Sequence, residues 1–224
     1  MNKETEEKVR KIVEEKLSCS SHDFDHTQRV YNTCLELAEG QNVDLEVLRL
    51  SALLHDIARA EEDEDNAGSK DHAELGAEAA GKILSQFDIP KEKIKKIQKC
   101  IYSHRYRNNH EPESKEAKIL FDADKLDVLG AIGIARAFVW VGENNANIYK
   151  KVNLKEYAKE NLKGGFGGKI KDPSKHSPQI EFSTKCKNLP KRMYTKEGRK
   201  MAEERLKFFK NFLSRLEKEI KGEK

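Results

Sequence analysis

Apolar side chains recur every three or four residues along most of this chain, which is the spacing of one face of an α-helix. The segments with this pattern are residues 3–17, 23–39, 45–58, 72–86, 90–104, 115–141, 180–192 and 196–220. Asp71 and Thr195 each precede a segment and are suited to cap its first turn. Strict β-alternation is absent from the sequence, so we expect an all-α fold, a compact multi-helix bundle with a long C-terminal helix.

The stretches between these segments are polar. Residues 60–71 and 105–114 are expected to be loops, and residues 163–179 are expected to form a mobile excursion. The last of these includes the glycine-rich run 164–168, which follows no predicted strand and lacks the spacing of a phosphate-binding loop. A lid or hinge is therefore favoured over a phosphate loop.

The composition is that of a highly charged helical protein. Hydrophobic and charged residues each make up 37% of the 224 residues, and we expect one domain over residues 1–224. The 43 basic residues barely outnumber the 39 acidic ones, so charge does not indicate a nucleic-acid partner. A local basic excess would instead suit a small phosphorylated substrate.

Cysteine usage and hydropathy indicate a compartment. Cys19, Cys34, Cys100 and Cys186 are scattered, as is typical of reduced thiols. The N-terminal residues are too polar for a signal peptide, and no apolar stretch approaches membrane-spanning length. We therefore expect a cytoplasmic protein without a membrane partner, and the oligomeric state stays open.

The dipeptide His55-Asp56 ends an apolar run, where an imidazole and a carboxylate are costly to bury unless a metal or another partner binds them. His26, on the inner face of segment 23–39, and Asp124, on the inner face of segment 115–141, could complete a site. Two nitrogens and two carboxylates suit Mn, Fe, Ni, Co or Zn better than Mg or Ca.

This order of residues resembles the HD-domain superfamily of metal-dependent phosphohydrolases, in particular its small, stand-alone microbial branch. The resemblance extends from about residue 20 to about residue 215 and is carried by residues 21–30, 52–59, 122–133 and 193–195. It implies core motifs in residues 20–140, with C-terminal helices 180–220 packed on them.

The resemblance also implies the roles of the acids and histidines. His26, His55, Asp56 and Asp124 would bind the metal. Asp122 and Asp127 compete with Asp124 and are better interpreted as outer acceptors or as partners of Arg29 or Arg136.

His72 and His104 are open between two roles, because members of the superfamily use histidines near these places either for a second metal or for phosphate contacts. Arg105 follows His104 where two-metal branches often have another histidine, so one divalent metal is favoured, with manganese preferred. Lys125 and Arg59 lie beside the ligands in sequence and could hold phosphoryl oxygens. Together with His72 and His104 they form the expected catalytic set.

Other polar residues receive simpler interpretations. Glu61 and Glu62 could orient a water molecule, but their acidic surroundings favour a solvated loop. His22 is expected to be a capping or exposed residue, and His110 and His176 are expected to be solvated.

The resemblance implies a phosphohydrolase that acts on a small phosphorylated metabolite, with a nucleotide as the preferred substrate. A metal-activated water would attack phosphorus, either converting a nucleoside triphosphate to monophosphate plus pyrophosphate or a monophosphate to nucleoside. The alternative is a non-catalytic nucleotide-sensing module with a structural metal. RNA cleavage is a weaker option, because no RNA-binding module is evident.

Overall fold

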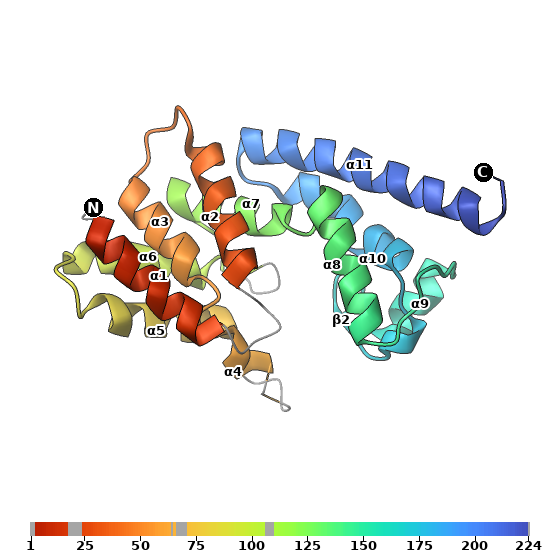
Figure 1. The fold of residues 1–224 in the computed structure, drawn as a ribbon, viewed down its shortest axis with the longest axis horizontal. Coiled ribbons are helices and arrows are strands. Elements are labelled where there is room, and N and C mark those ends of the chain that lie inside the picture. The colour runs from red at the N-terminus through yellow and green to blue at the C-terminus, as the bar shows by residue number, and fades with distance from the viewer. Residues whose placement is uncertain (1–2, 18–23, 64, 66–70, 106–109, 224) are drawn as a thin grey trace. The chain divides into compact units, whose positions relative to one another are not determined.

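The computed structural model describes residues 3–63, 65, 71–105 and 110–223 except residues 18–23. Helices account for most of these residues, which confirms the all-α fold class (Figure 1). The chain divides into two compact units, residues 1–124 and 125–224. The expectation of a single domain stays a prediction.

The first unit is built around α3. Its helices are α1 (Lys3–Leu17), α2 (Phe24–Ala38), α3 (Leu45–Leu54), α4 (Arg59–Asp63), α5 (His72–Leu84), α6 (Lys91–Tyr102) and most of α7 (Lys115–Leu126). α3 packs against α2 and α6, and α5 packs against α6. Leu48, Leu50 and Leu53 of α3 are fully buried, as expected of a helix that is apolar on nearly every side.

The prediction for residues 45–71 is partly wrong. α3 begins after Asp44 as expected, but it ends at Leu54, and residues 55–58 form a turn. The Arg59 amide donates to the Asp56 carbonyl at 2.9 Å, and α4 extends from Arg59 to Asp63, into the segment expected to be a loop. The His55-Asp56 pair therefore lies between two helices.

The prediction of a single helix over residues 115–141 is also wrong. α7 ends at Leu126, Leu129 has an extended backbone, and α8 (Gly130–Glu143) begins afterwards. Gly130 has a φ of 67°, which ordinary residues in a continuous helix cannot adopt. The hydrophobic period continues across the break, which explains the error.

The second unit contains α8, several shorter elements and a longer C-terminal helix. These are α9 (Leu154–Asn161), β1 (Leu162–Lys163), β2 (Lys169–Ile170), η1 (Pro173–Lys175), α10 (Pro178–Thr184), η2 (Cys186–Arg192) and α11 (Lys196–Ile220). α11 packs against α8 and η2, and Thr195 caps it as predicted, accepting from the Gly198 amide at 2.9 Å.

Two details of this unit differ from expectation. The helix expected over residues 180–192 is instead α10 followed by the 3-10 helix η2, which contains Pro190. β1 and β2 pair antiparallel around the glycine-rich run, where Gly164, Gly165 and Gly167 have positive φ. The predicted mobility of residues 163–179 stays a prediction.

His176 is buried, so the expectation that it is solvated is wrong. Its Nδ1 lies 2.7 Å from the Tyr157 hydroxyl, and its Nε2 lies 3.3 Å from a Glu181 oxygen. The Asn161 amide donates to the same hydroxyl at 2.9 Å. These contacts satisfy polar groups that burial would otherwise make costly.

Cys34, Cys100 and Cys186 are free, buried thiols, and Cys19 lies outside the described residues. Burial raises the pKa of the Cys186 thiol to about 12. Among the described helices, none combines the length and apolar character that crossing a membrane requires.

Candidate metal centre

Helix ends and turns of the first unit bring the candidate ligands together. His26 lies in the first turn of α2, His72 is the first residue of α5, and Asp124 lies near the end of α7. His55 and Asp56 occupy the turn after α3. Together with His104, which follows α6, these residues are buried, except that the Asp124 side chain is 17% exposed.

α5 can approach the His55-Asp56 turn because position 76 is glycine. A Cβ atom there would lie 3.3 Å from the His55 carbonyl oxygen, tighter than ordinary contact. Gly76 thus lets α5 carry its first residue, His72, close to Asp56.

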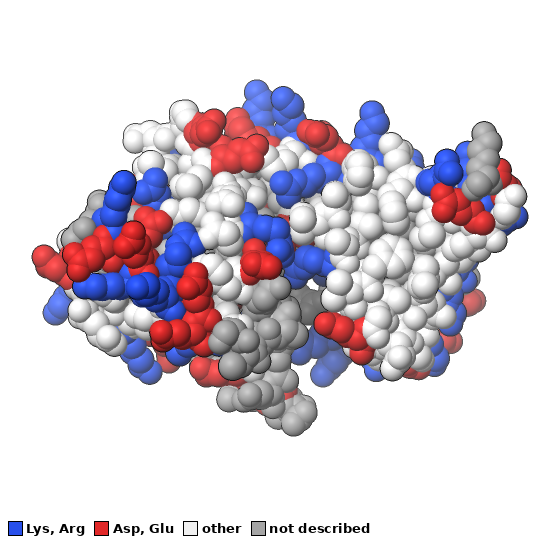
Figure 2. Space-filling view, viewed as in Figure 1, with Lys and Arg blue, Asp and Glu red and all other residues white. Residues whose placement is uncertain are grey.

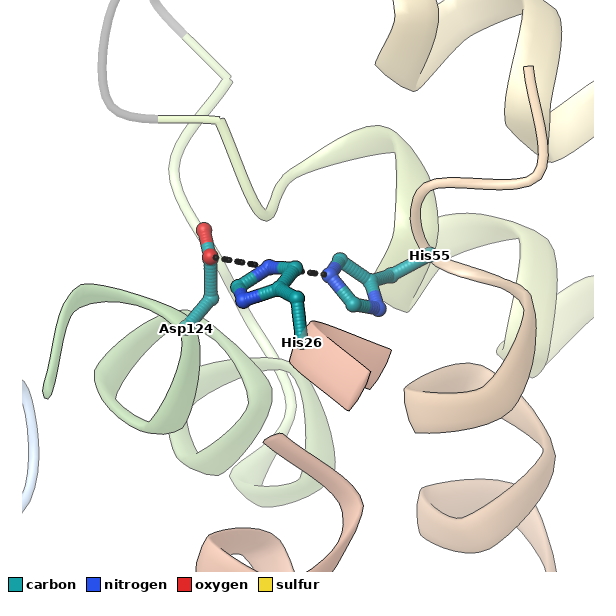
Figure 3. Close-up of side chains that lie close together, drawn as sticks. All are labelled: His26, His55 and Asp124. Atoms are coloured by element: carbon teal, nitrogen blue, oxygen red, sulfur yellow. Dashed lines mark hydrogen bonds and ion pairs between the residues drawn. The ribbon is translucent and has the colours of Figure 1, made fainter. Parts of the chain in front are cut away.

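His26, His55 and Asp124 form the first ligand group (Figure 3). The Nε2 atoms of His26 and His55 are 3.3 Å apart, and His26 Nε2 lies 3.4 Å from Asp124 Oδ1. Asp56 Oδ2 lies 3.7 Å from each of the two Nε2 atoms. The structure therefore brings the four sequence-predicted ligands together.

Asp56, His72 and His104 form the second ligand group. The Nε2 atoms of His72 and His104 are 3.2 Å apart, and Asp56 Oδ1 lies 3.3 Å from the first and 3.5 Å from the second. Asp56 thus directs one oxygen to each group.

The imidazoles of the second group are oriented for metal binding. His104 Nδ1 donates to the Ile101 carbonyl at 2.5 Å, and His72 Nδ1 donates to Glu62 at 2.7 Å. In a neutral ring this leaves the lone pair on Nε2. Two lone pairs that face each other across 3.2 Å repel unless a cation lies between them, so the residues fit a metal.

His55 has the same orientation, because its Nδ1 donates to the Ala52 carbonyl at 2.8 Å. Burial lowers the pKa of His55 to about 4 and also lowers that of His72, so both rings are neutral near pH 7. Burial alone would raise the pKa of Asp56, but His55, His104 and the other nearby imidazoles hold it well below its usual range. Neutral imidazoles and a charged carboxylate are the protonation states that metal binding needs.

Glu62 is the functional candidate that the sequence analysis set aside. It is buried, and its Oε2 accepts from His72 and from Arg59 Nη1 at 3.2 Å. Its Oε1 accepts from Arg105 Nη2 at 2.6 Å. Glu61 beside it is exposed, and nothing in a run of acids distinguishes the two.

The other residues that the sequence suggested differ in their burial and contacts. Lys125 follows Asp124 on α7 and is partly exposed, and its catalytic role stays a prediction. Asp122 is fully buried, and Asp127 is ion-paired with Arg136, one of the two arginines expected as partners. His110 is partly exposed, its ring centroid 4.0 Å from that of Tyr102, and His22 lies outside the described residues.

A sequence model of the HD domain family matches residues 23–129, the range that contains both ligand groups. Residues 23–129 of this chain are therefore an HD domain. Its HD motif is the His55-Asp56 pair, and Asp56 is the residue that faces both groups.

Several known proteins match nearly the whole chain. YpgQ of Bacillus subtilis (strain 168), an uncharacterised protein, is 28% identical over 207 residues, 91% of this chain and 86% of YpgQ. A crystal structure of YpgQ in complex with ADP is 27% identical, covers 96% of this chain and 95% of its own, and has a TM-score of 0.71.

A predicted HD superfamily hydrolase from an uncultured Thermotogales bacterium is 29% identical. The match covers 95% of this chain and 91% of that chain, with a TM-score of 0.65. The chain therefore has the fold of HD-superfamily hydrolases.

Proposed function

We propose that this HD-domain protein is a metal-dependent phosphohydrolase that acts on a small phosphorylated metabolite. The observation that carries the proposal is the pair of ligand groups that share Asp56. Burial of so many imidazoles and carboxylates around one point is costly unless cations compensate.

His26, His55, Asp124 and Asp56 would hold one divalent metal, and Asp56, His72 and His104 a second. The sequence favoured one metal, but the second group supports two, since its ligand atoms lie within 4.8 Å of one another. Manganese is preferred, with Fe, Ni, Co and Zn as alternatives for this donor set. When bound, such ions polarise phosphoryl oxygens and lower the pKa of water.

The residues of the chain would orient the substrate around this centre. Lys125 and Arg59 are proposed to contact phosphoryl oxygens, where fixed cations favour the negative charge that develops during phosphoryl transfer. Arg59 and Arg105 are already paired with Glu62, which holds their guanidinium groups in place beside His72. Such pairing reduces the positive charge that either guanidinium can offer to a phosphate.

A nucleotide is the proposed substrate, supported by the YpgQ structure with ADP. The reaction would be cleavage of a nucleoside triphosphate to monophosphate plus pyrophosphate, or of a monophosphate to nucleoside. The free, buried thiols support a cytoplasmic place of action.

The test is a panel of nucleoside mono-, di- and triphosphates and simple phosphate esters. Each substrate is incubated with metal-free protein and one divalent ion at a time, and phosphate and pyrophosphate are measured separately. We expect turnover with manganese and none with chelator present. Metal binding without turnover on any substrate would contradict the enzyme proposal.

That outcome would favour the alternative, a nucleotide-sensing module with a structural metal. The observation in its favour is the burial of the ligands, since structural metal sites are closed to solvent. Calorimetric titration of the metal-loaded protein with ADP would then show binding without hydrolysis.

A further inference from the structure

Glu62 occupies an unusual position for a residue in an acidic surface run. It is only 7% exposed, whereas Glu61 is exposed. Its two carboxylate oxygens accept from the three donors Arg59, His72 and Arg105. A buried carboxylate is tolerated when it is paired and hydrogen-bonded in this way.

These contacts form a closed path that begins and ends beside His72. The Asp71 side chain caps α5 by accepting from the Ala73 amide at 2.8 Å, and its other oxygen accepts from Arg105 Nη1 at 2.8 Å. Arg105 in turn donates to Glu62, and Glu62 accepts from His72, the residue after Asp71. The position of the ring and the direction of its Nδ1–H are both determined by this path.

We infer that Glu62 is a positioning residue that makes His72 a metal ligand, by holding its proton on Nδ1 and its Nε2 toward Asp56 and His104. The inference rests on the second metal of the proposed function. The two guanidinium groups keep Glu62 ionised, so that it acts as an acceptor.

Glu62→Gln tests this role because it preserves size and removes one acceptor oxygen. A glutamine amide must direct its NH2 group toward either Arg105 or His72, and both are donors. Facing His72, it favours the Nε2–H tautomer, which cannot bind metal through Nε2. We expect the affinity for the second metal to fall about 10–100-fold, as is typical of changes behind a metal-binding histidine.

The experiment is a calorimetric titration of metal-free protein with Mn²⁺, together with electron paramagnetic resonance. Wild type should bind two ions per chain and show the spectrum of a coupled pair. Glu62→Gln should retain the first ion and show an isolated Mn²⁺ spectrum at intermediate loading. Glu61→Gln, its exposed neighbour, is the matched control and should behave as wild type.

A double-mutant cycle separates positioning from a general structural effect. In a His72→Ala background, Glu62→Gln should change the affinity for the second ion less than about twofold, because the ring through which it acts is gone. An equal effect in both backgrounds would overturn the inference.

The remaining outcomes distinguish the inference from the function on which it rests. Two ions in wild type and unchanged affinity in Glu62→Gln overturn the role of Glu62 alone. One ion in wild type overturns the second metal and this role together, and turnover can still be measured. If Glu62→Gln does not fold, ¹⁵N NMR of metal-free wild type at pH 8 decides: an Nδ1–H tautomer of His72 supports the inference, and an Nε2–H tautomer overturns it.

Discussion

At the scale of single residues, Asp56 is the position of the metal centre where a substitution is expected to be least tolerated. Its two oxygens face different pairs of imidazoles, at 3.7 Å on one side and at 3.3 and 3.5 Å on the other. A residue that contributes charge to both groups has no substitute within the first unit as described, so its removal should affect every bound ion.

We predict that Asp56→Ala loses the bound metal and keeps the helical fold. The loss should exceed the roughly 10–100-fold that outer contacts contribute, because a charged ligand is removed. Elemental analysis and circular dichroism of the purified variant check this. Asp88→Ala, an exposed acid of the same unit, is the control, and wild-type metal content in Asp56→Ala would contradict the assignment.

We predict that Asp124→Asn reduces activity more than Asp122→Asn or Asp127→Asn. The amide is a poorer, neutral ligand, whereas outer changes cost only about 10–100-fold. Steady-state rates of the three variants decide the matter. An inactive Asp122→Asn beside an active Asp124→Asn would show that the wrong acid of α7 was chosen.

Lys125→Ala should leave metal content unchanged and slow turnover. Loss of a phosphate contact that strengthens in the transition state should reduce the rate by about 10²–10³-fold. Loss of an exposed lysine should leave the rate nearly unchanged, because exposed ion pairs contribute only roughly 0–1 kcal/mol to stability. Measurement of kcat at saturating substrate separates the two roles. An unchanged kcat would remove Lys125 from the proposed catalytic set.

At the scale of elements, the ends of helices deliver the chemistry. His72 begins α5, His104 follows α6, and the HD pair occupies the turn between α3 and α4. In a continuous helix, the side chains of neighbouring residues point about 100° apart. A turn removes this restriction, so two neighbouring side chains can both point toward the same site. The positions at which helices end, such as the break at Gly130, therefore help to determine the fold.

We predict that Gly130→Ala destabilises the protein by about 1–2 kcal/mol, the cost of a left-handed conformation for an L-residue. Its φ is 67°, and an added Cβ would lie 3.1 Å from Arg205 Cγ. Urea unfolding measures the effect. Gly142→Ala, within α8 and open to solvent, is the control and should stabilise by roughly 0.5–1 kcal/mol. Equal stabilities of the two variants would contradict the prediction.

At the scale of the whole molecule, the described ligands all belong to the first of the two units. Figure 2 shows positive and negative side chains interleaved on the surface around α1, and few charges on the surface around α8. The charged groups of the metal centre are instead buried, so they affect the stability of the fold itself.

We predict that metal-free protein loses stability as pH falls from about 6.5, the ordinary pKa of histidine, to about 4, the pKa of buried His55. In this range the unfolded chain binds a proton that the folded chain excludes, so the free energy of unfolding falls with pH. Above the range His55 is neutral in both states and contributes no slope. The loss for His55 is on the order of 3 kcal/mol.

Urea unfolding at several pH values, with chelator present, checks this prediction. His72, whose pKa is also lowered, should add to the slope, and Asp56 should contribute only at still lower pH. His55→Gln should have a shallower slope than wild type between pH 4 and 6.5. Parallel curves would show that His55 does not titrate as described.

Helical periodicity alone indicated α1, α2, α5, α6 and α11, because each has an apolar stripe that is local in the sequence. The caps Asp71 and Thr195 were equally predictable, since a capping side chain contacts amides only two or three residues away. The order of the ligands was visible for a similar reason: an imidazole or carboxylate in an apolar segment is rare enough to be noticed.

Only the tertiary structure decided which polar residues act together. Glu62 and Glu61 are indistinguishable in the sequence, yet packing buries one against His72 and leaves the other in solvent. His72 and His104 meet although 32 residues separate them. Such pairings depend on how α4, α5 and α6 pack, and no local pattern encodes a contact between distant segments.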